Sequence, residues 1–281
     1  MEEYKYIQQT EEAVLKVTEF KDLINELITL QEPIWVEGEV SEFKNWKDRW
    51  IYFSLKDEFS SIECNLPKYR LDEMGIELED GMTIRVLGFP ELKSTGRFTF
   101  NIFKIKVWGE GSLKKAYELL KKKLEEEGLF SRKREIPIFV EKIGLLTSKS
   151  GATIHDFKKN LKPFGFKIYF YDVEVEGENS VASIVEGINW FNKNMPFLDV
   201  IVIIRGGGSL EELQAFNNEI LARAIFASKI PVICGIGHET DVPIASLVAD
   251  VAVSTPTAVA HYLNKNWENL FFEYPLSLIH I

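Results

Sequence analysis

The stretch Asp199–Asn217 constrains the fold of this 281-residue chain more than any other. It begins with Val200–Ile204, an apolar run in which every residue is β-branched. Such a run is typical of a strand that is buried on both faces, as in a parallel sheet. Arg205 follows the run and is itself followed by three glycines, Gly206, Gly207 and Gly208. The pattern predicts an α/β domain in which one buried strand ends in a glycine-rich turn beside an arginine.

A helix is expected after the glycines, over 210–228, because Ser209 is a suitable N-cap and Glu212 completes a capping box. Glycine N–H groups, the helix N-terminus and Arg205 would together bind an anion such as phosphate. This is neither a P-loop, since no lysine follows the glycines, nor a dinucleotide-binding motif, since Glu211 occupies the third glycine position. A turn that only packs a helix on a sheet is the alternative, but such a turn rarely needs three glycines beside an arginine. The candidate phosphate-binding residues are Gly206, Gly207, Gly208 and Ser209.

A second candidate loop follows the next buried strand, Ile230–Ile233, and runs through Cys234–Asp241. In an open α/β sheet, ligands bind outside the carboxyl ends of the strands. His238 and Asp241 are therefore expected on the same edge of the sheet as Arg205. A lone histidine is usually structural, but one in a glycine-flanked loop with carboxylates at this edge is a candidate catalytic residue.

At these stretches the chain resembles a known family, the large subunit of exodeoxyribonuclease VII. The matching segments, which occur in the family's order, are Arg205–Glu211 with Phe216–Asn217, Gly237–Asp241, Ala249–Asp250 and Ser254–Thr257. The resemblance implies a cytoplasmic hydrolase of DNA catabolism and repair, which cleaves phosphodiester bonds of single-stranded DNA to give oligonucleotides. The chain departs from the family's usual residues at Ala252, at Val242–Pro243 and at His155.

The resemblance also implies a set of catalytic residues: Asp156, Arg205, His238 and Asp241. His238 suits acid–base chemistry because a histidine titrates near neutral pH. Arg205 and the glycine N–H groups would stabilise the charge of the transition state, and a carboxylate would orient His238 or activate water. The two aspartates could instead gather Mg²⁺. The sequence leaves the metal open, because the family is described as able to work without metal although some members respond to Mg²⁺.

The region from Ile34 to Val107 has a different pattern, with five short strands and a helical insert near Tyr69–Gly75. This pattern predicts an OB-fold barrel, a fold that binds single strands through stacking aromatic side chains and cations along the phosphates. Because strand side chains alternate in and out, half of the aromatic residues could be core instead. Trp46 is the best candidate, since it lies in a polar loop. The candidate nucleic-acid-binding residues are Phe43, Lys44, Trp46, Trp50, Tyr52 and Lys56.

The predicted architecture is thus an N-terminal all-β OB-fold followed by an α/β domain with a mostly parallel, doubly wound sheet. The expected boundaries are a polar segment and helix over 1–31, the OB-fold over 32–108, a hinge and linker helix over 109–135, the α/β domain over 136–262 and an atypical tail over 263–281. In the resembled family a long helical arm carries small subunits. No sustained heptads follow Thr257 here, so we expect this chain not to hold several small subunits.

Composition places the chain among globular proteins, with 46% hydrophobic and 27% charged residues. The net charge of −10 argues against nucleic acid when taken alone, but binding depends on local charge at cellular salt. The N-terminus is too acidic for a signal peptide, and no apolar run is long enough to span a membrane. Cys64 and Cys234 are expected to be reduced core residues of a cytoplasmic protein.

Two other functions fit the same residues. The chain could be a non-catalytic single-strand-binding protein in which only the OB-fold acts. It could also be an α/β enzyme acting on a small phosphorylated ligand, with a fused OB module. An assay of single-stranded DNA cleavage with and without EDTA separates these alternatives from a nuclease.

Overall fold

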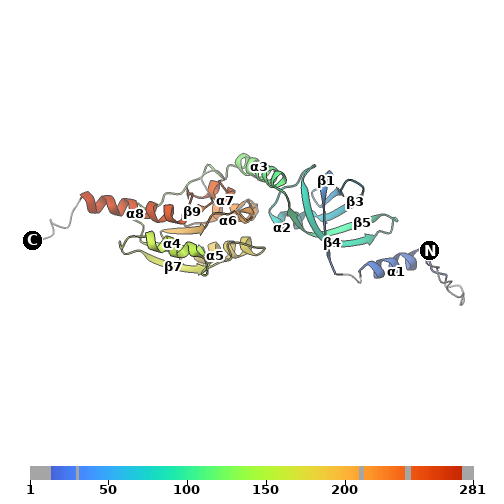
Figure 1. The fold of residues 1–281 in the computed structure, drawn as a ribbon, viewed down its shortest axis with the longest axis horizontal. Helices are drawn as coiled ribbons and strands as arrows, with labels where there is room; N and C mark the ends of the chain where they lie inside the picture. Colours follow the sequence, from blue (N-terminus) through green and yellow to red (C-terminus); the bar gives the residue numbers. More distant parts are fainter. Residues whose placement is uncertain (1–13, 30–31, 209–211, 238–241, 274–281) are drawn as a thin grey trace, which may run out of the picture. The chain divides into compact units, whose positions relative to one another are not determined.

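The computed structural model describes residues 14–29, 32–208, 212–237 and 242–273. The chain divides into two compact units (Figure 1). The first unit comprises Met1–Arg70 and Glu79–Lys106, and the second comprises Leu71–Leu78 and Val107–Ile281. The segment 71–78, which the sequence placed in the barrel, therefore belongs with the second unit.

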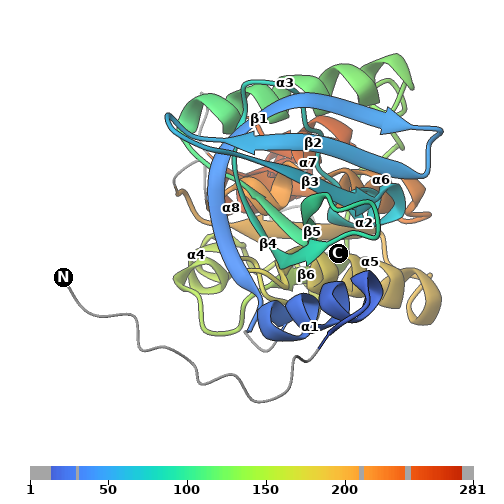
Figure 2. The same ribbon diagram turned by 90° about the vertical axis from the view of Figure 1, so that its right-hand side faces the viewer.

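The first unit is a closed five-stranded barrel in the order β1-β2-β3-β5-β4, which confirms the predicted OB-fold (Figure 2). Along β2, Ile51, Phe53 and Leu55 are buried while the residues between them face outward, as the period of two requires. Helix α1 packs beside β4, where Asn25 exchanges two hydrogen bonds with the backbone of Leu92. The elements are α1 Val17–Thr29, β1 Ile34–Trp46, β2 Trp50–Lys56, β3 Ser61–Pro67, α2 Lys68–Met74, β4 Thr83–Leu92 and β5 Phe98–Val107.

The second unit contains a five-stranded sheet in the order β10-β9-β8-β6-β7, and all of its strand pairs are parallel. This arrangement confirms the predicted sheet. Its elements are α3 Glu110–Glu126, β6 Lys142–Thr147, α4 Ala152–Asn160, β7 Lys167–Asp172, α5 Ser180–Asn194, β8 Val200–Arg205, a 3₁₀ turn η1 Gln214–Phe216, α6 Glu219–Ala227, β9 Val232–Ile236, α7 Ile244–Val248, β10 Val251–Val253 and α8 Pro256–Glu273.

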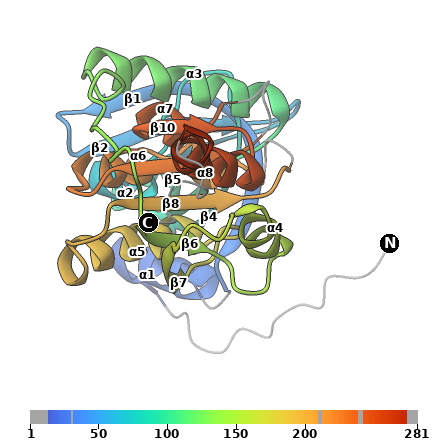
Figure 3. The same cartoon turned by 90° about the vertical axis from the view of Figure 1, so that its left-hand side faces the viewer.

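Helices cover both faces of this sheet, and each face has its own core. One core joins α5, α6 and α7 to side chains such as Ile201 and Ile203 of β8. The other joins α4 and α8 to Val200, Val202 and Ile204 of the same strand. Figure 3 shows α4 and α5 on opposite sides of the sheet. The chain leaves β6 toward α4 and the neighbouring β8 toward α6, which lie on opposite faces. In open α/β sheets the crevice for ligands lies outside the carboxyl ends of the strands at such a point.

Two segments expected outside the α/β domain are part of it. Helix α3, expected to be a linker, buries Leu120 and Leu124 in the core that includes α5 and α6. The predicted boundary at residue 262 falls inside helix α8, where Leu263 and Asn264 are buried and Trp267 donates its indole N–H to the Val140 carbonyl at 3.0 Å. The predicted tail is therefore folded as far as α8 is described. Its residues beyond Glu273 lie outside the described part of the chain.

The two cysteines are free and buried, as expected from the sequence. Burial raises the pKa of the Cys64 thiol to about 12, so this side chain is a neutral core residue at physiological pH. Within the described residues, the structure contains no helix with the length and apolar character needed to cross a membrane.

Candidate functional site

The candidate site lies at the carboxyl edge of the sheet, where β8 ends in Arg205. Its backbone pairs with Ile236 at the end of β9, two residues before the loop that carries His238. The expected adjacency of these two strands is thus confirmed. His238 and Asp241 themselves lie outside the described residues, so the predicted proximity of their side chains to Arg205 stays a prediction.

The Arg205 side chain is almost completely buried, with 1% of its surface exposed. Its Nη2 atom donates to Glu176 at 3.0 Å and to Glu212 at 2.8 Å, and its Nη1 atom donates to the Gly206 carbonyl at 3.3 Å. The expectation that Arg205 stands at a solvent-accessible edge is therefore wrong. The reason is that Glu176, from the loop after β7, and Glu212 close over the guanidinium from outside, while both carboxylates stay largely exposed.

Glycine at position 208 is required by this ion-paired cluster. A Cβ atom at Gly208 would collide with the Glu212 carboxylate and with the Arg205 guanidinium. Gly206 is different, because the nearest atom to a Cβ there is the Thr153 hydroxyl oxygen at 3.6 Å, an ordinary contact. The glycines thus allow the main chain to pass directly over the arginine. Ser209, the fourth predicted phosphate ligand, lies outside the described residues.

The predicted helix over 210–228 is wrong in its first half. Between Glu212 and Asn218, where the structure describes this stretch, the only helical element is the 3₁₀ turn η1, and α6 begins at Glu219. The Asn218 side chain caps α6 by accepting from Ile220 N at 2.9 Å, while its amide donates to the Met74 carbonyl at 2.7 Å. An asparagine that satisfies free helix N–H groups fixes the helix start at its own position. The N-terminus of α6 is therefore separated from the glycines and does not complete their anion site.

Three buried side-chain atoms of the second unit have no hydrogen-bond partner among the described residues: Thr147 Oγ1, Arg205 Nε and Ser246 Oγ. Thr147 ends β6 and Arg205 ends the neighbouring β8, so two of these atoms belong to the strand ends that border the crevice. Buried polar atoms are nearly always paired in native proteins. Unpaired ones at these strand ends need a polar partner, which a ligand or a water molecule can supply. Thr147 was not predicted, although a polar residue closing a buried strand was the signal.

Asp156 is exposed on the second turn of α4. No described contact joins it to Arg205, so its predicted catalytic role stays a prediction. The described residues contain no group of three histidine, cysteine, aspartate or glutamate side chains arranged to hold a metal ion. Since His238 and Asp241 are outside that set, Mg²⁺ binding by Asp156 and Asp241 stays a prediction.

Asp250 has a structural role. Its carboxylate accepts from Val232 N at 2.6 Å and from Arg134 N at 2.6 Å, and it forms an ion pair with the Arg134 guanidinium at 2.9 Å. The carboxylate is fully buried. These bonds fix the start of β9 and therefore support the strand that leads to His238.

In the first unit, the β1–β2 hairpin gathers most of the predicted nucleic-acid-binding residues on its outer face. Trp46 lies opposite Trp50, and Lys44 lies opposite Tyr52. The rings of Trp50 and Tyr52 are 6.4 Å apart and nearly parallel. The three aromatic side chains are between 40% and 58% exposed, so their faces are open to bases. Lys47 adds a cation 5.4 Å from the Trp46 ring.

Two of the predicted barrel residues differ from this group. Phe43 is only partly exposed, and its ring stacks 6.5 Å from that of the buried Phe53, so it contributes to barrel packing. It sits at an irregularity in β1 that alters the alternation of side chains. Lys56 is ion-paired with Glu39 at 3.1 Å on the exposed surface. The sequence also missed Phe59, which is 91% exposed in the β2–β3 turn. A lone aromatic residue in a polar turn was the signal for it. Trp46, which was expected in a polar loop, is instead the last residue of β1 and pairs with Trp50, because the hairpin strands extend further than predicted.

Together, an OB-fold with an exposed aromatic hairpin and a parallel α/β domain with a buried arginine at its crevice define a nucleic-acid-binding protein of two parts. Comparison with known families gives the same division. The OB-fold nucleic acid binding domain matches residues 15–106, and the family described as exonuclease VII, large subunit, matches residues 130–274. The chain belongs to the exonuclease VII large-subunit family.

Curated relatives agree with this assignment. The exodeoxyribonuclease 7 large subunit of Halothermothrix orenii is 39% identical over 266 residues, which cover 91% of this chain and 65% of the relative. That of Bacillus cytotoxicus is 44% identical over 241 residues, which cover 84% of this chain and 53% of the relative. The chain thus spans between about half and two thirds of the length of these relatives.

Proposed function

We propose that this chain binds single-stranded DNA on the β1–β2 hairpin and hydrolyses its phosphodiester bonds at the crevice between β6 and β8. The observation that carries the proposal is the buried Arg205 guanidinium at the crevice. It is oriented by two carboxylates and retains an unpaired Nε atom. A buried, oriented arginine is suited to stabilising the charge that develops on a phosphate during hydrolysis.

In this proposal some N–H donors of Arg205 bind groups of the protein and the others bind the substrate. A guanidinium has five N–H donors. Two serve Glu176 and Glu212, and one serves the Gly206 carbonyl. Among the described residues, the Nε–H and one Nη1–H have no acceptor, and we assign them to non-bridging phosphate oxygens. Because Glu176 and Glu212 cover the guanidinium, their side chains must move outward before a phosphate can reach these donors.

The reaction itself requires that water attacks phosphorus and that the leaving oxygen receives a proton as its bond to phosphorus breaks. His238 is our candidate for moving these protons, since it follows β9 beside Arg205 in the sheet. Asp241 would orient the imidazole, and Asp156 would approach from α4. Arg205 would hold the non-bridging oxygens throughout. Any Mg²⁺ would be held by the two aspartates and would add positive charge at the same phosphate.

The barrel accounts for the preference for single strands. Bases of a duplex are stacked on each other and cannot reach Trp46, Trp50 or Tyr52, whereas those of a single strand can. Free buried cysteines are consistent with a reducing compartment, and we place the activity in the cytoplasm.

The test is a single-turnover assay with end-labelled single-stranded and blunt duplex DNA, with Mg²⁺ and with EDTA. We expect the single strand to be cleaved preferentially. The variant Arg205→Met keeps a side chain of similar length without the charge, and we expect it to lose about 10²–10³ in rate, the cost of one preorganised donor. Unchanged cleavage by Arg205→Met, or equal cleavage of duplex, would contradict the proposal.

A non-catalytic single-strand-binding protein remains the second candidate. The observation that favours it is the closure of Glu176 and Glu212 over Arg205, which would be permanent in a protein that performs no hydrolysis. The same assay separates the two functions, because this candidate binds the labelled strand and leaves it intact under every metal condition.

A further inference from the structure

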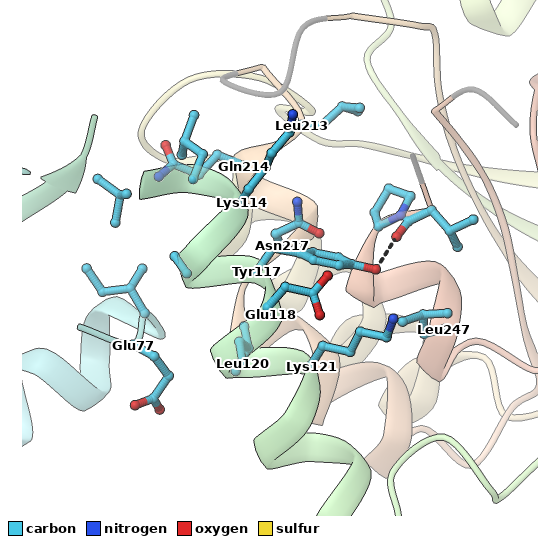
Figure 4. Close-up of a pocket in the computed structure, with 16 residues that line it drawn as sticks. Glu77, Lys114, Tyr117, Glu118, Leu120, Lys121, Leu213, Gln214, Asn217 and Leu247 are labelled. Carbon is cyan, nitrogen blue, oxygen red and sulfur yellow. Dashed lines mark hydrogen bonds between the residues drawn. The ribbon is translucent and has the colours of Figure 1, made fainter. Parts of the chain in front are cut away.

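The second unit contains a groove of about 670 Å³ on one side of α3 (Figure 4). Its floor and walls are mainly apolar and come from α3, from the segment around η1 and from the segment leading into α7. A volume of this size lies in the range of about 300–1,000 Å³ that is typical of small-molecule sites. The main apolar lining residues are Leu113, Ala116, Leu120, Leu213, Pro243 and Leu247.

Polar groups on the groove walls have unused hydrogen-bonding capacity. The Gln214 amide and the Glu118 carboxylate make no side-chain hydrogen bond or ion pair to any described residue. Asn217 uses its carbonyl oxygen to accept from Ile244 N at 3.0 Å, and its NH₂ group donates to none of the residues that the structure describes. The groove therefore offers both donors and an acceptor at the edge of an otherwise apolar space.

The groove is continuous with the segments that form the candidate site. Gln214 and Asn217 follow Glu212, which holds Arg205. On the opposite wall, Tyr117 donates a 3.0 Å hydrogen bond to the carbonyl of Val242, the residue directly after the loop that carries His238 (Figure 4). A ligand in the groove would thus contact both chain segments that leave the carboxyl ends of β8 and β9.

We propose that this groove holds one base of the substrate strand next to the phosphate at Arg205. This inference rests on the proposed function for the identity of the ligand. A base is flat and neutral and carries donors and acceptors along its edge, which matches an apolar groove edged by Gln214, Asn217 and Glu118. A phosphate does not match, because the Glu118 carboxylate would repel it. The Tyr117 ring supplies an aromatic surface of the kind on which bases stack.

The charged side chains around the groove fit a strand whose base enters the groove while its phosphates stay outside. Lys121 lies with its Nζ atom 5.7 Å from the centre of the Tyr117 ring. Lys114, two turns before Lys121 on α3, forms an exposed ion pair with Glu110 at 2.6 Å. At the rim, Lys121 would neutralise phosphates that stay outside while the base enters. The site would therefore recognise a nucleotide by its base and leave the sugar–phosphate chain toward solvent.

The test measures binding, so that it does not depend on cleavage. Short single-stranded oligonucleotides with phosphorothioate linkages would each carry one abasic residue, placed at successive positions. Their affinity for the full 281-residue chain would be measured by fluorescence anisotropy. Besides the positions whose bases stack on Trp46, Trp50 and Tyr52, we expect one further position at which loss of the base weakens binding by about 5- to 150-fold, the range for one stacked base.

Substitutions of groove residues test whether the base at that position binds in the groove. Ala116→Phe fills the space, and Tyr117→Ala removes the ring; both should abolish the effect of the abasic residue at that position. Tyr117→Phe keeps the ring and should preserve the effect. Tyr262→Ala is the matched control, because Tyr262 is exposed on α8 of the same unit and does not line the groove. Thermal unfolding would verify that each variant is folded.

The proposal is overturned if folded Ala116→Phe and Tyr117→Ala retain the same dependence on every abasic position as the unmodified chain. The groove would then serve another occupant, such as a peptide. The outcome is distinguishable from failure of the proposed nuclease function. A chain that never cleaves DNA but shows a groove-dependent abasic position would keep the base site and lose only the hydrolysis.

Discussion

The guanidinium of Arg205 and the carboxylate of Glu176 form a 3.0 Å ion pair between the last residue of β8 and the loop that follows β7. The arginine is buried, whereas 63% of the glutamate side chain is exposed. Glu176 therefore acts on Arg205 from the solvent side, and its charge remains hydrated when the arginine is absent. This asymmetry makes Glu176 a positioning residue in the proposed mechanism.

Changes at Glu176 should affect turnover more than stability. Glu176→Ala removes one acceptor of the guanidinium, and we expect turnover to fall on the order of tenfold, the effect of one charge-assisted hydrogen bond. Glu176→Gln keeps an acceptor oxygen and should restore most of the rate. The measurement is kcat and KM on single-stranded DNA, together with the melting temperature. A rise in KM alone, or equal loss in both variants, would show that Glu176 does not orient Arg205.

The two glycines flanking Gly207 offer a matched pair of substitutions. Gly208→Ala places a methyl group against the Arg205–Glu212 pair, and we expect a loss of stability of about 1–3 kcal/mol, the usual cost of overpacking. Gly206→Ala meets only an ordinary contact and should change stability little. Neither glycine has a positive φ, so backbone strain does not distinguish them. Urea unfolding of both variants checks the prediction, which is contradicted if they are equally stable.

Comparison of the predicted with the observed position of Arg205 shows what the local sequence can and cannot predict. The strand predicted over Val200–Ile204 forms as β8 and ends one residue later, at Arg205, because a buried strand is recognisable from its own apolar run. The ion pair with Glu176 joins residues 29 positions apart and depends on how a loop folds over β8. No periodicity encodes such a contact. The burial of Arg205 was therefore not predictable even though its place at the strand end was.

The predicted start of helix α6 was wrong for a different reason. Two helix-start signals compete in this region, a capping box after the glycines and the asparagines at 217 and 218. Asn218 prevails because its side chain also bonds to Met74, and Glu219 N donates to the Gly75 carbonyl at 3.0 Å. Those partners come from a segment more than 140 residues earlier. Tertiary contacts thus decided between two local signals that the sequence alone presents as equally valid.

For the barrel, Trp46→Ala should weaken binding of single-stranded DNA by about 1–3 kcal/mol, the value of one stacked base. The melting temperature should be unchanged, since 58% of the side chain is exposed. Trp35→Ala is the control, because Trp35 is similarly exposed but pairs with β4 instead of β2. Fluorescence anisotropy with a labelled oligonucleotide measures both. If the two variants bind equally well, the β1–β2 hairpin is not the binding surface.

The stability of the second unit should fall in acid because of Glu219. Burial raises the pKa of this carboxyl, but hydrogen bonds from Lys123 at 2.8 Å and Arg223 at 2.8 Å outweigh it and lower the pKa below 4.5. A group whose pKa is lower in the folded state contributes stability above its unfolded pKa and loses it as the pH falls through the folded value.

Substitution makes this contribution measurable. The free energy of unfolding of Glu219→Gln should be lower than that of the unmodified chain at pH 7, and the difference should shrink as the pH falls below about 4.5. Urea unfolding between pH 3 and 7 gives both curves. Glu126→Gln, at an exposed position near the end of α3, is the control and should show a small difference at every pH. A difference for Glu219→Gln that is constant with pH would mean that the ion pairs with Lys123 and Arg223 do not stabilise the folded chain.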